Sequence, residues 1–147
     1  MANPTFLLTA ESIKSVAGEF DLEVIFKLNV IREGLRRIEN LHLCPNLIEL
    51  NLTGNAIERI EGLDSLVKLK KLALTGNKIK KIENCDKLVA LEHLLLQDNN
   101  IADIDDVNHL ASLPILRSLY FRNIDGTQKN PVCDHPAYRV VILRVLP

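Results

Sequence analysis

The sequence predicts an α/β solenoid of about five repeats, with a parallel concave sheet and short helices or 3₁₀ turns on the convex side. A helical cap is expected at each end. The main observation is a set of Leu, Ile and Asn positions that returns every 22 residues, most clearly from Leu47, Leu69 and Leu91. The second is a composition with 47% apolar but only 4% aromatic residues, which suits a core of stacked aliphatic layers.

Each full copy has the pattern LxxLxLxxNxI, which predicts a short strand followed by a returning coil. The matching positions are Leu47, Leu50, Leu52, Asn55, Ile57 and Ile60, then Leu69, Leu72, Leu74, Asn77, Ile79 and Ile82, then Leu91, Leu94, Leu96, Asn99, Ile101 and Ile104. The leucines and isoleucines are expected to fill the interior. Each asparagine is expected to hydrogen-bond backbone groups of the turns, so that successive copies form a ladder.

The N-terminal segment predicts a capping helix over residues 10–17. Thr9 suits the N-cap position, and Gly18 suits the left-handed residue that ends a helix. Ile13 and Val16 are expected to face inward. The helix should cover the open end of the first repeat, since terminal repeats need a cap with a polar outer face.

The first repeat begins at Ile25 and has Glu33 where the other copies have Asn. Because a terminal layer lacks one neighbour, we expect the need for the amide to be weaker there. The fourth copy is longer, with 25 residues from Leu91 to Leu116. Its extra segment, residues 102–110, predicts a helical turn on the convex side, with inward residues at Ile104, Val107, Leu110 and Leu113.

The fifth repeat begins at Leu116 and has Ile124 at the expected asparagine position. A short insertion, residues 123–129, follows. After Asp134 the apolar spacing predicts an amphipathic helix over the last layer, through Tyr138, Val141, Ile142, Val145 and Leu146. We expect one domain over residues 1–147, with a cap at 1–24, repeats at 25–129 and a cap at 130–147.

Charge and cysteine usage argue against several functions. The net charge is −1, so we expect no direct nucleic-acid contact and no attraction to an anionic membrane. Cys44 and Cys85 fall on leucine positions of the repeat and are expected in the core of a protein from a reducing compartment. No Cys/His spacing suggests a metal, and the acidic group of Asp98, Asp103, Asp105 and Asp106 lacks EF-hand spacing. We expect no metal and no cofactor.

Strand alternation places three columns of side chains on the concave face. They are Lys27, Glu49, Lys71, His93 and Ser118; Asn29, Asn51, Ala73, Leu95 and Tyr120; and Ile31, Thr53, Thr75, Gln97 and Arg122. An exposed Leu and Tyr among polar and charged groups is a plausible binding hot spot. Scattered apolar residues are also normal on surfaces, so a plain solvated face is the alternative. The expected partner-binding residues are Lys71, His93, Leu95, Gln97, Tyr120 and Arg122.

These repeats resemble the 22-residue class of leucine-rich repeat proteins, which includes a protein phosphatase 1 regulatory subunit, the outer-arm dynein light chain and leucine-rich acidic nuclear phosphoproteins. Asn130-Pro131-Val132-Cys133, Tyr138-Arg139 and Leu146-Pro147 look like the capping motif of that class. The resemblance implies an intracellular, cytoplasmic adaptor, with cilia or the cytoskeleton as expected locations.

The expected activity is therefore protein–protein interaction without catalysis. We expect a monomer with another protein as its partner and with no small-molecule substrate. Two alternatives remain open. One is a regulatory subunit that docks on a phosphatase, and the other is a protein component of a ribonucleoprotein.

Overall fold

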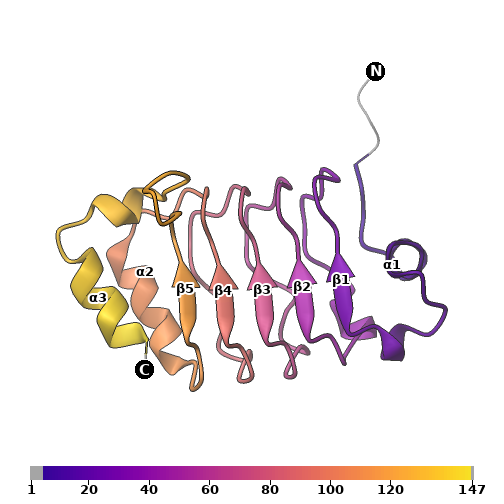
Figure 1. Ribbon diagram of the computed structural model, residues 1–147. Coiled ribbons are helices and arrows are strands. Elements are labelled where there is room, and N and C mark those ends of the chain that lie inside the picture. The colour runs from indigo at the N-terminus through magenta and orange to yellow at the C-terminus, as the bar shows by residue number, and fades with distance from the viewer. Residues whose placement is uncertain (1–4, 147) are drawn as a thin grey trace.

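A computed structural model describes residues 5–146 and confirms the α/β leucine-rich-repeat solenoid. Five short strands form one parallel sheet in sequence order, as Figure 1 shows. They are β1 (Lys27–Asn29), β2 (Glu49–Asn51), β3 (Lys71–Ala73), β4 (His93–Leu95) and β5 (Ser118–Tyr120).

The core is a stack of aliphatic layers. The central leucines of adjacent strands lie in register, from Leu28 through Leu50, Leu72 and Leu94 to Leu119. The first four of them are buried, and Leu119 packs partly buried against the same core. Burying a Leu side chain contributes about 1.5–3 kcal/mol, so the repeated pattern itself is the main source of stability.

The N-terminal helix α1 (Ala10–Ala17) is confirmed at both ends. The Thr9 hydroxyl accepts a hydrogen bond from Ser12 N, the Ser12 hydroxyl accepts one from Thr9 N, and Gly18 ends the helix at φ +71°. Ile13 is fully buried, as expected. The expectation for Val16 was wrong, because the eight-residue helix covers β1 with one narrow face and leaves Val16 at its exposed edge.

The convex side carries short 3₁₀ segments and the predicted helical turn. After the 3₁₀ helices η1 (Leu22–Val24) and η2 (Leu41–Leu43), the fourth copy forms α2 (Ile104–Val107) and η3 (Asn108–Ser112). Asp103 caps α2 by accepting a hydrogen bond from Asp105 N. The 22-residue copies between η2 and α2 have turns and coil on this side, as the shorter spacing predicts.

The C-terminal cap consists of η4 (Pro131–Asp134) and α3 (Tyr138–Val145). Helix α3 buries Val141 and Val145 and packs against α2 and η3, at the opposite end of the sheet from α1 (Figure 1). No helix within residues 5–146 is long and apolar enough to span a membrane.

The asparagine ladder is confirmed. Asn77 illustrates one rung: its Oδ1 accepts from Ile57 N at 3.1 Å, and its Nδ2 donates to Leu52 O at 3.0 Å and Leu74 O at 2.9 Å. Asn55 and Asn99 repeat this geometry in the neighbouring layers. The ladder thus ties the turn of each layer to the next through a buried amide.

The rung of the fifth layer comes from an unexpected residue. Asn130 is fully buried, donates through Nδ2 to Leu96 O and Phe121 O, and accepts from Ile101 N. Ile124, at the position expected from the repeat spacing, is almost completely exposed instead. The insertion therefore leaves the solenoid as a surface loop and returns an asparagine to the same place in the stack.

Candidate functional site

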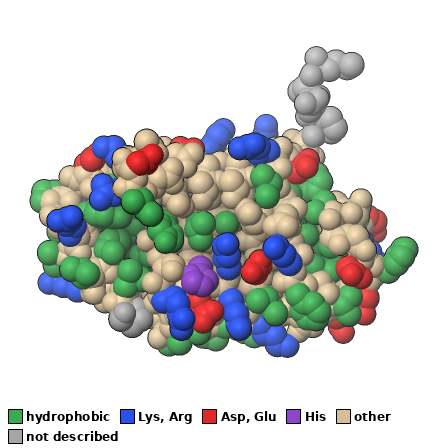
Figure 2. Space-filling model, in the orientation of Figure 1, with side chains coloured by type: hydrophobic (Ala, Val, Ile, Leu, Met, Phe, Trp, Pro, Cys, Tyr) green, Lys and Arg blue, Asp and Glu red, His purple; other side chains and the backbone are tan. Residues whose placement is uncertain are grey.

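The strand register assembles the first two of the expected columns on the concave face. The first runs from Lys27 through Glu49, Lys71 and His93 to Ser118, and the second from Asn29 to Tyr120. Figure 2 shows charged side chains and a histidine across the middle of this view, between hydrophobic groups. In the third column, Thr75 Oγ1 donates to Gln97 Oε1 at 3.0 Å.

Charge on this face is unevenly compensated. Lys27 Nζ lies 3.3 Å from Glu49 Oε2, so these two charges offset each other. Lys71, the next residue of the column, has no ion pair within residues 5–146, and His93 follows it. The middle of the concave face therefore carries an uncompensated positive charge.

Apolar surface gathers at the C-terminal end of the same face. Leu95 and Tyr120 are register neighbours on β4 and β5. Leu95 is half-buried, Tyr120 is 40% exposed, and Ile124, on the inserted loop, is 98% exposed. We call these three residues the concave patch. The sequence pattern did not identify Ile124, because it sits at a position that the repeat reserves for a buried asparagine.

A shallow cavity of about 500 Å³ lies beside the concave patch, lined by Gln97, Tyr120, Asn123, Ile124 and Asp125. Asp125 accepts hydrogen bonds from the hydroxyl and the N–H of Thr127, and these bonds hold the pKa of its carboxyl below the usual value. The inserted loop therefore adds a fixed negative charge to the edge of an apolar surface.

Arg122 is placed differently from the other expected residues. Its guanidinium carbon lies 5.9 Å from the centroid of the Tyr138 ring, and that ring meets Phe121 edge to face at 6.3 Å between centroids. Burial, followed by the neighbouring Cys133, raises the pKa of the Tyr138 hydroxyl. Arg122 thus packs on the C-terminal cap and borders the concave patch from that side.

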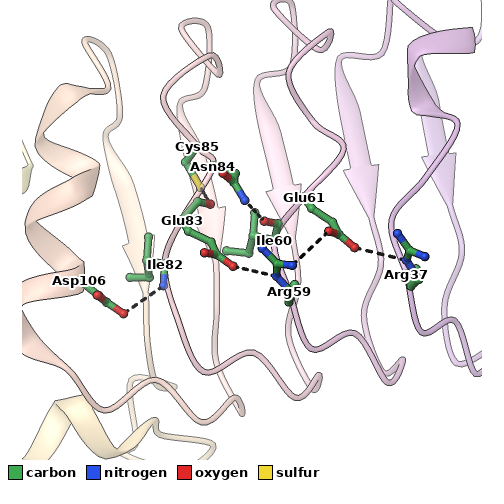
Figure 3. Close-up of polar contacts among 9 residues, drawn as sticks. All are labelled: Arg37, Arg59, Ile60, Glu61, Ile82, Glu83, Asn84, Cys85 and Asp106. Atoms are coloured by element: carbon green, nitrogen blue, oxygen red, sulfur yellow. Dashed lines mark hydrogen bonds and ion pairs between the residues drawn. The ribbon is translucent and has the colours of Figure 1, made fainter.

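Another face of the solenoid carries a chain of ion pairs between layers, shown in Figure 3. Glu61 lies 3.5 Å from Arg37 and 3.9 Å from Arg59, and Arg59 lies 3.2 Å from Glu83. The arginines of these pairs are well exposed, so each pair contributes at most about 1 kcal/mol. We assign this chain of charges to the scaffold.

The acidic group of the fourth repeat is smaller at the surface than its sequence suggests. Asp106 is 8% exposed, with Oδ2 placed 3.4 Å from Ile82 N, so it belongs to the interior rather than to the acidic surface (Figure 3). No ion pair within residues 5–146 joins the basic group of Lys78, Lys80 and Lys81 to the acidic residues of the next layer. The two patches face solvent as separate groups.

The reactive residue types are dispersed. Cys44 and Cys85 are buried in the core, as expected, and burial raises the pKa of both thiols. In the described part of the chain, no three His, Cys, Asp or Glu side chains lie close enough to hold a metal ion. What the concave face offers is shape, an apolar patch and a positive charge, which are the elements of a protein-binding surface.

Comparison with known proteins supports the fold. A family model described as leucine-rich repeat matches residues 35–147. An internalin, InlF, from Listeria monocytogenes is 37% identical over 75% of this chain with a TM-score of 0.65, and the match spans 34% of that chain. A chain of the Drosophila melanogaster SNF/U2A′ complex is 24% identical, with a TM-score of 0.73, over 90% of this chain and 74% of its own length.

No curated protein matches the sequence. A second internalin of Listeria monocytogenes, InlC2, is 25% identical over 74% of this chain and 62% of its own, with a TM-score of 0.51. The internalin and SNF/U2A′ likenesses agree with the solenoid fold described above. Because the family match also covers well over half of the sequence, this chain belongs to the leucine-rich repeat family.

Proposed function

We propose that the chain is a non-catalytic interaction module, or adaptor, that binds another protein through its concave face. The observation that carries the proposal is the concave patch: Leu95 and Tyr120 on the sheet and Ile124 on the inserted loop expose apolar surface beside an open cavity. Leucine-rich repeat solenoids use such extended concave surfaces for binding. A sheet held by a buried ladder loses little conformational entropy when a partner docks.

The proposal gives the surrounding residues separate roles. Tyr120 supplies the anchor, since a Tyr side chain buries a large area and loses few rotamers. Lys71 presents positive charge and His93 a polar ring along the N-terminal side of the patch, and Gln97 offers hydrogen bonds at the cavity. Arg122 supports the C-terminal border from its position over Tyr138.

The test is quantitative affinity capture followed by measurement with the purified partner. We expect Tyr120→Ala and Leu95→Asp each to weaken binding at least about tenfold, as hot-spot truncations do. Val89→Asp is the matched control, because Val89 is 50% exposed and lies outside the three columns. Circular dichroism confirms that each variant is folded. Equal partner recovery by the wild type and both patch variants would show that the concave patch is not the binding site.

A second candidate is a protein component of a ribonucleoprotein. The favouring observation is the likeness in fold to a chain of the SNF/U2A′ complex, which covers 90% of this chain. As such a component, the chain would contact RNA only through its protein partner, since its net charge of −1 does not attract the phosphate backbone. Recovery of RNA with the captured partner, lost on Tyr120→Ala, supports this candidate, whereas an RNA-free complex removes it.

We also propose membership of the 22-residue class and a relation to leucine-rich repeat-containing protein 61, on the residues at both ends of the chain. An intracellular, cytoplasmic location, with cilia and the cytoskeleton as the first places to look, rests on the class resemblance alone. Imaging of the tagged chain tests the location. Residue-by-residue comparison of segments 8–23 and 123–130 with that protein tests the relation.

A further inference from the structure

The two ends of the solenoid carry unexpected apolar surface. A capping element should present a polar outer face to water. Here Phe20, which follows α1 in the N-terminal cap, is 95% exposed, and Leu143, on α3, is 77% exposed. Neither residue belongs to the concave patch.

Acidic residues surround the exposed residues of the N-terminal end. The segment Glu19-Phe20-Asp21-Leu22-Glu23-Val24 alternates acidic and apolar side chains, and Val24 is also exposed. Glu19, Asp21 and Glu23 have no ion pair within residues 5–146. We call residues 19–24 the acidic end.

Basic residues flank the exposed residues of the C-terminal helix. Val140 and Leu143 are exposed on α3, whereas Val141 and Val145 are buried. Arg139 and Arg144, adjacent to them in sequence, are exposed and have no ion pair within the described part of the chain. We call residues 139–144 the basic end.

The two ends are complementary in both charge and apolar character. They lie at opposite ends of the sheet, beyond β1 and beyond β5 (Figure 1), and Figure 2 shows acidic side chains gathered at the first end and basic side chains at the second. A surface on one molecule that matches a different surface on its neighbour makes a head-to-tail contact. Within one chain the ends cannot meet, because the stacked sheet separates them.

We propose that the acidic end of one copy binds the basic end of a second copy, so that the chain associates head to tail. Phe20 and Val24 pack against Val140 and Leu143, and Glu19 and Glu23 face Arg139 and Arg144. The concave face remains open in this arrangement, so a partner could bind to several copies side by side. The contact is small and partly electrostatic, which predicts weak association that salt reverses.

Sedimentation velocity on the 147-residue chain tests the proposal. At about 50 mM salt, the average sedimentation coefficient should rise as the concentration increases from about 10 µM to about 1 mM, and it should fall back at about 500 mM salt. Reversal of one end, Glu19→Lys with Glu23→Lys, should weaken association more than about tenfold. Arg139→Glu with Arg144→Glu should do the same.

The decisive variant carries both reversals in one chain. Its net charge equals the wild-type value of −1, and its ends are again complementary, so association should return to within about threefold of the wild type. Glu58→Lys with Asp64→Lys is the matched control, because both residues are exposed in the middle of the solenoid and the charge change equals that of the acidic-end reversal. This control should keep the association.

The apolar contribution is tested separately with Phe20→Ser and Leu143→Ser, which should each weaken association, against Val89→Ser, which should not. If a charge reversal unfolds the chain, these serine variants still test whether the two ends bind each other. A wild type that stays monomeric throughout, as the sequence suggested, overturns the proposal. Association that is unchanged by the reversal of either end also overturns the proposal, as does a failure of the variant with both ends reversed to associate.

Discussion

The asparagine ladder makes an unequal prediction for two similar residues, Asn55 and Asn77. Asn55 Oδ1 accepts from Glu33 N at 3.0 Å and Leu35 N at 3.1 Å, and its Nδ2 is the side-chain donor to Val30 O at 2.7 Å. These three backbone groups lose their ladder partner in Asn55→Ala. Asn77→Ala leaves only Ile57 N without its side-chain partner. Leu52 O and Leu74 O keep a side-chain donor, because they also accept hydrogen bonds from Asn55 and Asn99 in the adjacent layers.

A buried group left without a hydrogen bond costs about 1–3 kcal/mol. For Asn77→Ala, with one such group and two weakened carbonyls, we expect a loss of about 2 kcal/mol in the free energy of unfolding. For Asn55→Ala we expect about 4 kcal/mol, with Glu33 N discounted because it lies near solvent. The first layer, where Glu33 replaces the amide, therefore depends on Asn55 more than the central layers depend on their own asparagines.

Urea unfolding at neutral pH measures both losses, and an unchanged m-value shows that the same surface is exposed in each variant. Asn100→Ala is the control, since Asn100 is exposed, and it should stay within about 0.5 kcal/mol of the wild type. Hydrogen exchange should accelerate at the Leu35 amide in Asn55→Ala and at the Ile57 amide in Asn77→Ala. Equal losses for the two variants, or a larger loss for Asn77→Ala, would refute the reasoning from shared carbonyls.

Three further predictions concern the scaffold. Gly18 and Gly62 both have φ near +70°, but a Cβ at Gly62 would lie 2.7 Å from Ile38 O and one at Gly18 meets nothing within 4 Å. Gly18→Ala should therefore cost about 1–2 kcal/mol and Gly62→Ala clearly more in urea unfolding, and equal costs would contradict the clash. Asp103→Ala removes the N-cap of α2 and should cost about 1 kcal/mol, with Asp103→Asn retaining most of the stability. Burial, then Asp86 and Glu83, raises the pKa of Cys85 from its usual 9.0 to about 12. The unfolded thiol therefore ionises first, so its contribution to stability is complete below pH 9 and is lost from there to about pH 12. Cys85→Ala should flatten that fall in urea titrations at several pH values, and an identical slope would contradict the assignment.

The parts of the fold that follow from local rules were predictable from the sequence. Strand alternation and the 22-residue step place Leu50, Leu72 and Leu94 in one column, because each must be buried for the layers to stack. Thr9 and Gly18 mark the ends of α1 through backbone geometry that a few residues determine. The columns that include Leu95 and Tyr120 follow from the same register.

The path of the inserted loop was not predictable in this way. Repeat spacing assigned the ladder position to Ile124, but Asn130 occupies it in the structure. A repeat period cannot predict how many residues an insertion adds before the chain rejoins the stack. The burial of Val16 depends on how a short helix sits on its neighbour, so the apolar pattern alone predicted the wrong side for it. The function of the concave patch depends on a partner outside the chain.

The buried rung at Asn130 has a practical consequence for residues 123–129. The fifth layer requires the Asn130 amide at a fixed position, but not a fixed number of loop residues before it. The two ends of the loop are held together by the backbone hydrogen bond from Asn130 N to Phe121 O at 3.0 Å. Closing a longer loop between fixed ends costs little additional entropy. Foreign peptides could therefore be grafted near Gly126, where the solenoid would display them at the rim of its concave face without disturbing the layers beneath.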